Sequence, residues 1–361
     1  MSGSNDPEPG ASPPPQPEEA SETIPVREAH RFDTTALAAL IARDLDAKLI
    51  DVRQMRGGQS NPTFLIDTDA GAFVLRKQPP GDLLPSAHAV DREHTVLKAL
   101  ATTDVPVPRP VLFCADRDVI GTPFYLMERL QGRVFWHPTL PSLDREERRA
   151  IFMAMNETLA RLHRVDWRAV GLESYGKPGD YFGRQIRRWS RQWDASRTRE
   201  NAALDHLAAW LPAHIPEGDE TCVCHGDYRL DNLMFHASEP RVIGILDWEL
   251  STLGHPLADL AYNCICYVTA PTIYKGLHGL DLDALNLPTM DEYVAAYCAH
   301  AGRDDGITAF HLAFSMFRLA AILEGVYARG KAGNASSEEA LRVGALGTTL
   351  AERGWAIAQG G

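Results

Sequence analysis

The sequence predicts an α+β fold in which a small antiparallel β lobe with one helix precedes a large, mainly helical lobe. Up to about residue 128, several short runs alternate apolar and polar residues, as strands do. From Leu143 onwards, apolar residues recur mostly at helical spacing. A length of 361 residues is sufficient for two lobes and a sizeable core. The natural binding cleft of such a protein lies between its lobes.

The elements of the small lobe can be assigned in order. Residues 33–45, DTTALAALIARDL, open with capping residues and continue with helical periodicity. Residues 64–77, FLIDTDAGAFVLRK, are two alternating runs around DTDAG, which indicates a β-hairpin. Residues 86–101 form a helix with an apolar stripe, and strand-like PVLFCAD and PFYLME follow on either side of RDVIGT.

The rest of the chain is predicted to be helical apart from one short strand region. REERRAIFMAMNETLARLH, DYFGRQIRRWSRQW and the long C-terminal segment read as helices, whereas TCVCHGDYRLDNLMF and RVIGILDWE read as strands. Residues 1–31 are rich in Pro, Glu and Ser, and cannot bury enough apolar surface to order themselves. We therefore expect a disordered tail at 1–31, an N-terminal lobe at 32–128 and a C-terminal lobe at 129–361.

Composition excludes some classes of function. A formal charge of -12 argues against a nucleic-acid partner, which requires a basic footprint. We see no apolar run long enough to span a bilayer and no signal peptide at the N-terminus, so we expect no membrane association and a cytoplasmic location. Cys222 and Cys224 would share a strand face, but no further ligand spacing completes a metal site. Buried free thiols are the expectation for the cysteines.

The segment HGDYRLDN carries the chemistry. Asp227 is followed five residues later by Asn232, and RVIGILD delivers Asp247 at the end of a strand. Two carboxylates and an amide carbonyl are hard oxygen ligands that suit Mg²⁺ together with substrate phosphates, and one carboxylate remains free to orient a hydroxyl. The order Asp, Asn, Asp is also that of the protein-kinase active site. The alternative is a surface loop with solvated charges.

HGDYRLDN and ILDWE resemble the phosphotransferase motif of the aminoglycoside phosphotransferase and choline kinase family, a branch of the protein-kinase-like fold. GGQSNPTFLI, FVLRK, REHTVLKAL, FYLMERLQG, LARLH and HPLADLA fall in the family's order, so the resemblance covers most of the chain after the tail. GGQSN, VLRKQPPG and DWELSTLGHPLADLA are similar to the branch associated with acyl-CoA dehydrogenases. The resemblance implies a bilobal kinase-like fold with a nucleotide-binding N-terminal lobe, a catalytic and substrate-binding C-terminal lobe, and ATP and Mg²⁺ as cofactors.

The resemblance also implies roles in the catalytic loop. Asp227 would orient and deprotonate the acceptor hydroxyl, while Asn232 and Asp247 would hold magnesium. Arg229 lies where many protein kinases carry a lysine that touches the transferred phosphate, and an ion pair with a neighbouring acid is the alternative. His225 and Asp259 resemble structural supports of this loop.

The nucleotide-binding residues are expected in the small lobe. Alternation in FVLRK places Arg76 on the face opposite Phe73 and Leu75, and Arg76 aligns with the phosphate-binding lysine of the family, with Lys77 as the alternative phosphate contact. Glu93 shares the apolar face of its helix, so it needs a cationic partner, which in the family is the strand cation.

Two backbone segments complete the expected nucleotide site. The glycines of RGGQSNPT, including Gly58, would let amides approach phosphates, with Ser60 or Asn61 as side-chain donors. An ordinary turn is equally consistent with this segment. FYLMERLQG resembles the hinge, where the carbonyl of Glu128 and the amide of Leu130 would meet adenine.

The acceptor is indicated by a basic helix. Residues 183–200 carry two acids, two tryptophans that share a helical face, and six arginines: Arg184, Arg187, Arg188, Arg191, Arg197 and Arg199. Such a face suits an anionic, partly apolar molecule, although it could be a solvated helix face. Arg318, within an apolar run, could grip a carboxylate or phosphate, but a buried ion pair is favoured.

Together these features predict an ATP- and Mg²⁺-dependent O-phosphotransferase for a hydroxyl of an anionic acyl or acyl-CoA-like substrate. Its partners would be a nucleotide and a small-molecule hydroxyl substrate, with a functional link to acyl-CoA dehydrogenases. One alternative is an aminoglycoside, choline or other amino-alcohol kinase. Another is a non-catalytic nucleotide-binding module, since Arg76 replaces the usual lysine.

Overall fold

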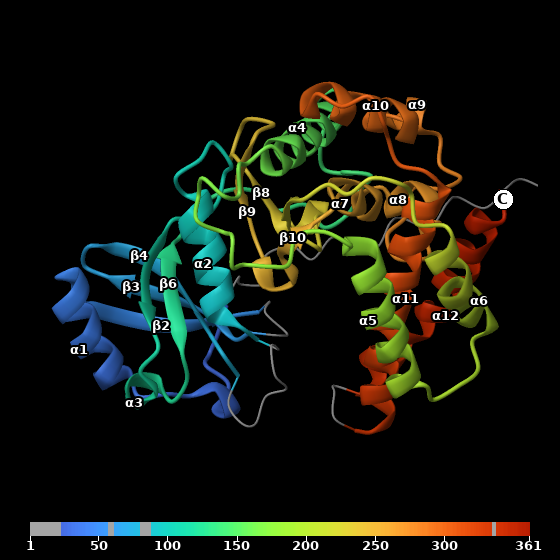
Figure 1. Cartoon of the computed structure of the whole chain (residues 1–361). Helices are drawn as coiled ribbons and strands as arrows, with labels where there is room; N and C mark the ends of the chain where they lie inside the picture. The colour runs from blue at the N-terminus through green and yellow to red at the C-terminus, as the bar shows by residue number, and fades with distance from the viewer. Residues whose placement is uncertain (1–22, 57–60, 80–87, 334–336) are drawn as a thin grey trace, which may run out of the picture.

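The computed structural model describes residues 23–56, 61–79, 88–333 and 337–361. Its small lobe contains a six-stranded antiparallel sheet with the order β1-β2-β3-β4-β6-β5 (Figure 1). The strands are β1 (Thr23–Ile24), β2 (Leu49–Met55), β3 (Thr63–Thr68), β4 (Gly71–Lys77), β5 (Pro110–Cys114) and β6 (Phe124–Glu128). The helices are η1 (Glu28–His30), α1 (Thr34–Leu45), α2 (Val90–Leu100) and α3 (Arg117–Ile120). The predicted antiparallel lobe is confirmed.

The β3–β4 hairpin decides which side chains face the cleft between the lobes. Its register pairs Phe64 with Leu75 and Thr63 with Arg76. Residues directly opposite each other in an antiparallel ladder lie on the same face of the sheet. Phe64 and Leu75 accordingly pack in one apolar cluster with α1, whereas Thr63 and Arg76 line the cavity between the lobes. The alternation predicted for FVLRK is confirmed.

Helices cover both faces of this sheet. The Asp33 side chain accepts hydrogen bonds from the amides of Thr35 and Ala36, which satisfies two free donors of the first turn of α1. The apolar stripe of α1 packs against the outer face of the sheet. On the cleft side, Leu97 of α2 packs in the same cluster as Tyr125 of β6. Glu93 of α2 is therefore held at the inner surface, where it is 1% exposed.

Three details of the small lobe differ from the sequence prediction. The tail predicted at 1–31 extends too far, because Thr23–Ile24 pair with β2 and the Arg27 amide donates to Gln54 Oε1. The sequence pattern missed β2, most of whose residues are at least partly exposed and so show no clean alternation. RDVIGT, expected as a connection between strands, contains the short helix α3, whose start is capped by the Asp116 side chain.

The large lobe is helical, with two small two-stranded sheets (Figure 1). Its helices are α4 (Arg145–His163), α5 (Tyr181–Ser196), α6 (Ala202–Trp210), η2 (Leu211–Ala213), η3 (Leu230–Asn232), η4 (Trp248–Leu250), α7 (Pro256–Asn263), α8 (Ile265–Val268), α9 (Leu282–Leu285), α10 (Met290–Ala301), α11 (Ala309–Lys331) and α12 (Ser337–Ala358). Strands β7 (Cys222–Cys224) and β10 (Thr252–Gly254) form one sheet, and β8 (Leu233–Phe235) and β9 (Val242–Ile245) form the other. The predicted strand region thus forms two separate ladders.

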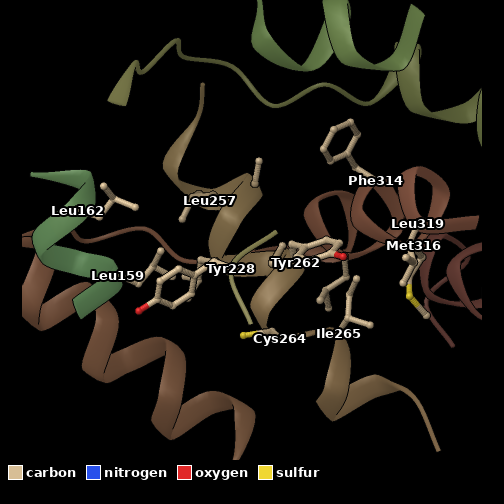
Figure 2. Packing of buried hydrophobic residues seen from close by; sticks show 14 of the residues in the cluster. Leu159, Leu162, Tyr228, Leu257, Tyr262, Cys264, Ile265, Phe314, Met316 and Leu319 are labelled. Atoms are coloured by element: carbon tan, nitrogen blue, oxygen red, sulfur yellow. The ribbon is translucent and has the colours of Figure 1, made fainter. Parts of the chain in front are cut away.

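Helix α7 lies at the centre of the large-lobe core. Figure 2 shows Leu159 of α4 on one side of α7 and Phe314 of α11 on the other. All eight residues of α7 are buried, and Tyr262 is among them. Because α7 follows the strands that flank HGDYRLDN, its burial fixes the position of that loop relative to α4 and α11.

Helix α11 differs from the expectation that no apolar run is long enough to span a bilayer. By length and composition it could cross a membrane, with a mean hydropathy of 1.4 over its most apolar window. However, 83% of that window is buried inside the protein. Arg318 and Glu324, both buried, lie within the same helix. These features are those of the core helix of a folded lobe.

Candidate functional site

A cavity of about 840 Å³ lies between the lobes. The sheet contributes Val74 and Arg76, and the large lobe contributes Asn232 and Asp247. The segment after β6 also lines it, including the two residues predicted to meet adenine, Glu128 and Leu130. The proposed phosphate-loop residues Gly58 and Ser60 lie outside the described residues, so their role stays a prediction.

Asp227 is fixed by hydrogen bonds to both of its carboxylate oxygens. Tyr262 Oη donates to Oδ1 at 2.6 Å, and Asn232 Nδ2 donates to Oδ2 at 2.8 Å. Each oxygen of an ionised carboxylate has two acceptor positions, so each keeps one for a further donor. The side chain is 17% exposed and therefore remains accessible. A carboxylate held in this way can accept the proton of a bound hydroxyl.

Asn232 and Asp247 present the oxygen donors expected of a magnesium site. Asn232 Nδ2 is committed to the carboxylate and the backbone carbonyl of Asp227, so its Oδ1 is the atom left for a cation. Asp247 follows β9 in a left-handed conformation with φ of 63°, and its side chain is 37% exposed. The Leu246 amide just before it donates to the Asn232 carbonyl, which ties the two segments together. An amide oxygen and a carboxylate at one cleft suit Mg²⁺ bound with a nucleotide's phosphates.

Arg76 connects this site to the small lobe. Its Nε lies 2.8 Å from Glu93 Oε2, and its Nη2 donates to Asp247 Oδ1 at 2.6 Å. Burial lowers the pKa of Arg76, but the carboxylates of Glu93 and Asp247 outweigh this and hold that pKa above its ordinary value. The guanidinium is therefore a permanent positive charge at the cleft, and the expected pair with Glu93 is present.

Two neighbours of Arg76 have roles that the sequence did not settle. Lys77 points to the outer face, where its ammonium group lies 5.2 Å from the centre of the Phe32 ring. Asn61, predicted as a possible phosphate donor, is buried, and its Nδ2 instead donates to Glu93 Oε1 at 2.6 Å. Tyr125 Oη donates to the other oxygen of Glu93. A buried carboxylate requires this many partners, which explains why Asn61 turns inward.

His225 and Asp259 support the catalytic loop from behind. Asp259 accepts the amides of His225 and Gly226 at 2.6 and 2.9 Å. His225 Nδ1 accepts the Asp227 amide, so its Nε2 carries the proton that is donated to the Leu246 carbonyl. With both ring nitrogens engaged, His225 serves as a structural link rather than as an acid or base.

Gly226 is required by this arrangement. Its φ is 82°, and a Cβ atom there would lie 2.5 Å from the backbone oxygen of Leu250. Only glycine adopts that conformation without strain and without a clash. A separate structural requirement thus explains each of the three residues of HGD.

Arg229 makes the ion pair that was the alternative to phosphate contact. Its Nε lies 3.2 Å from Asp231 Oδ1 and 3.5 Å from Asp227 Oδ2, and its Nη1 donates to Tyr274 Oη. Contact with a transferred phosphate stays a prediction. Sequence reasoning missed both Tyr262 and Tyr274, because tyrosines in apolar segments read as core residues.

The buried cysteines have a neighbour that sequence spacing did not show. His163, Cys222 and Cys224 place their ligand atoms within 4.8 Å of one another. Tyr297 and Asp259, however, occupy the two ring nitrogens of His163. Burial raises the pKa of both thiols, which keeps them protonated. The cluster therefore packs β7 against α4 and α10.

Comparison with known proteins adds independent findings. A model of the phosphotransferase enzyme family matches residues 51–306. Acyl-CoA dehydrogenase family member 10 of Mus musculus is 46% identical over 312 residues, covering 86% of this chain and 29% of that protein. Acyl-CoA dehydrogenase family member 11 of Rattus norvegicus is 42% identical over 345 residues, covering 92% and 44%. The chain spans less than half the length of these relatives.

Solved structures support the fold assignment. A Ralstonia eutropha protein described as a candidate aminoglycoside phosphotransferase has a TM-score of 0.84 at 46% identity, over 91% of this chain and 99% of that one. Spectinomycin phosphotransferase, solved with ADP and spectinomycin, has a TM-score of 0.61 at 11% identity, over 90% and 98%. The second likeness concerns the fold alone. The predicted kinase-like bilobal fold is confirmed.

Proposed function

Because the chain belongs to the phosphotransferase enzyme family, we propose that it transfers the terminal phosphoryl group of ATP to a hydroxyl of an anionic acyl compound, with Mg²⁺. Membership confirms the resemblance predicted from HGDYRLDN and ILDWE, and with it an enzyme that uses an alcohol group as acceptor. The proposal depends on one observation: Arg76, Asn232 and Asp247 line one cavity, and Asn232 in turn binds the carboxylate of Asp227.

The reaction asks the protein mainly for positioning and for compensation of charge. Asp227 orients the acceptor hydroxyl and takes its proton as the oxygen attacks the terminal phosphorus. The bond from that phosphorus to the bridging oxygen breaks, and ADP leaves with the electron pair. Arg76 contributes positive charge to the phosphates. Asn232 Oδ1 and the Asp247 carboxylate would hold magnesium, which would supply further charge neutralisation.

Two features support an acyl compound as the acceptor. An apolar cavity of about 110 Å³ adjoins the catalytic loop and is lined by Phe152, Met155 and Ile265 beside Arg229 and Tyr262. Such a lining suits a hydrocarbon chain better than a polyamine. The names of the curated relatives refer to acyl-CoA dehydrogenases, which is consistent with a substrate or partner in acyl-group chemistry.

A coupled assay for ADP release tests the proposal. The panel contains short- and medium-chain hydroxy acids, their CoA thioesters, choline and kanamycin-like aminoglycosides, each with Mg²⁺ and ATP. We expect turnover of hydroxyacyl compounds. Turnover of aminoglycosides or choline alone would establish the alternative kinase function, and binding of ATP without turnover of any acceptor would favour a non-catalytic module.

A further inference from the structure

Arg318 of α11 lies directly beside the catalytic loop. Its Nη2 donates to the backbone carbonyl of Gly226, the residue before Asp227, at 2.5 Å. Its guanidinium carbon lies 5.1 Å from the centre of the Tyr262 ring, and the Tyr262 hydroxyl in turn contacts Asp227. Arg318 is therefore close to the carboxylate that accepts the hydroxyl proton in the proposed reaction, and it is only 6% exposed.

Arg318 has no carboxylate partner within the described part of the chain, contrary to the buried ion pair favoured from sequence. Its contacts there are one carbonyl oxygen and two aromatic rings. Its Nε and Nη1 make no hydrogen bond to the described residues, and both atoms keep some contact with solvent. A nearly buried cation is costly unless an anion compensates it.

A second arginine lies on the same tryptophan. The guanidinium carbons of Arg318 and Arg188 lie 5.7 and 5.1 Å from the centre of the Trp189 ring. Partial burial and the charge of Arg318 both lower the pKa of Arg188, so the two guanidinium groups are within electrostatic range of each other. Within the described part of the chain, the Arg188 side chain contacts this ring and pairs with no carboxylate.

The other arginines of this basic segment have partners within the protein. Arg184 donates to the Lys177 carbonyl, Arg187 pairs with Asp180, Arg191 donates to the Arg187 carbonyl, Arg197 pairs with Asp205, and Arg199 pairs with Glu324. Arg188 is therefore the arginine of this segment that shares an aromatic ring with Arg318.

We propose that Arg318 and Arg188, which both contact the Trp189 ring, form a site for an oxyanion of the acceptor beside the catalytic loop. The inference rests on the proposed function, and it names the residues that would select an anionic acceptor. A guanidinium presents donors in a planar fork that matches a carboxylate or phosphate. The oxyanion is either the carboxylate of a free hydroxy acid or a phosphate of a CoA carrier.

The test compares Arg188→Gln and Arg318→Lys with Arg191→Gln, which removes one exposed charge from the same helix. Each variant is assayed with the hydroxy acid that wild type phosphorylates best, its CoA thioester and its neutral amide. Losing a hydrogen bond to a charged group weakens binding about ten- to hundredfold. We expect KM for the anionic acceptor to rise by that factor in the first two variants, with KM for the amide unchanged and Arg191→Gln like wild type.

The change in KM for each acceptor has a defined interpretation. A rise confined to the free acid identifies a carboxylate, and a rise confined to the thioester identifies a carrier phosphate. Equal rises for the neutral amide, no rise in either variant, or the same rise in Arg191→Gln would overturn the proposal. Arg188→Gln keeps the test valid if Arg318→Lys fails to fold, because Arg188 is exposed.

Two controls separate this inference from its premises. The slow rate of ATP hydrolysis without acceptor measures the function of the catalytic loop independently of acceptor binding. If Arg318→Lys loses this hydrolysis as strongly as transfer, Arg318 merely holds the Gly226 carbonyl and the inference fails. If wild type phosphorylates no acceptor, the proposed function fails, but calorimetry of the same free acid, thioester and amide still tests the oxyanion site. Weaker binding of the anions to Arg188→Gln than to wild type supports the site, and equal binding refutes it.

Discussion

Arg76 Nη2 lies 2.6 Å from Asp247 Oδ1, so a strand of the small lobe is joined to the predicted metal ligand of the large lobe. The same guanidinium contacts Glu93, which Asn61 and Tyr125 also bind. One cation thus connects α2, β4 and the segment after β9. Binding of a nucleotide's phosphates at this place would act on both lobes at once.

Arg76→Met should weaken ATP binding and also lower stability. The substitution leaves Glu93 buried without its cation, and breaking a buried pair in this way costs about 3–5 kcal/mol. Lys77→Met is the matched control, because Lys77 lies on the outer face against Phe32. Titration with Mg²⁺–ATP and thermal unfolding of both variants measure the two effects. Equal ATP affinity in both variants would show that Arg76 is only structural.

Asp227→Asn should lower kcat while Mg²⁺–ATP still binds. The amide cannot accept the proton of the hydroxyl, and a general base contributes roughly 10²–10⁴-fold. Its size is nearly unchanged, but its amide nitrogen cannot accept a hydrogen bond, so one of the two bonds from Tyr262 and Asn232 is lost. Steady-state kinetics with the best acceptor and calorimetry with ATP are the measurements. A loss below about tenfold in kcat would remove Asp227 from the role of base.

Tyr262→Phe should lower kcat with little change in KM for ATP. The hydroxyl donates to Asp227 Oδ1 at 2.6 Å, and its removal frees the carboxylate to rotate. A lost hydrogen bond to a charged group is worth about 1.5–3 kcal/mol, which predicts a decrease of roughly ten- to hundredfold. Tyr274→Phe, which removes a contact to Arg229 instead, is the comparison. Similar decreases in both variants would argue against a specific role for Tyr262.

Asp247→Ala should abolish the magnesium dependence of ATP binding. It deletes the carboxylate donor of the pair formed with Asn232, and it also frees Arg76 from one of its anions. Calorimetry with ATP, with and without Mg²⁺, distinguishes the two consequences. Retention of metal-dependent affinity would mean that Asp247 serves only as the partner of Arg76.

Asp259 should make stability depend on acid pH. Burial raises the pKa of this carboxyl, but hydrogen bonding to His163 and to the loop amides outweighs that and holds the pKa below its ordinary value. A depressed pKa stabilises the folded state above the unfolded value near 4, and this stabilisation is lost as pH falls through the folded value. Asp259→Asn should therefore flatten the acid limb of a melting-temperature curve, and an unchanged limb would refute the assignment.

The catalytic loop could be predicted because its chemistry is local in sequence. HGDYRLDN places Asp227 and Asn232 five residues apart, and a strand places Asp247 next to them. Alternation in FVLRK likewise fixed the direction of Arg76. These features depend on backbone geometry and little on the rest of the fold.

The remaining contacts depend on packing that sequence periodicity does not encode. Tyr262 donates a hydrogen bond to Asp227, which lies 35 residues earlier in the sequence. The apolar sequence around Tyr262 indicates only a core helix. Its place in a loop suggested that Asn61 binds phosphate, whereas its side chain donates a hydrogen bond to the buried Glu93. Of the six arginines in the basic segment, Arg188 contacts the same tryptophan as Arg318, and only the packing of α5 against α11 shows this.

Identification of the reaction product tests phosphoryl transfer to an acceptor hydroxyl most directly. The protein, Mg²⁺, ATP and a mixture of hydroxy acids and hydroxyacyl-CoA thioesters are incubated, and the products are analysed by mass spectrometry and phosphorus NMR. We expect a phosphate monoester on the hydroxyl, formed in step with ADP and absent with Asp227→Asn. ADP formation without any phosphorylated acceptor, or the same product yield from Asp227→Asn, would contradict it.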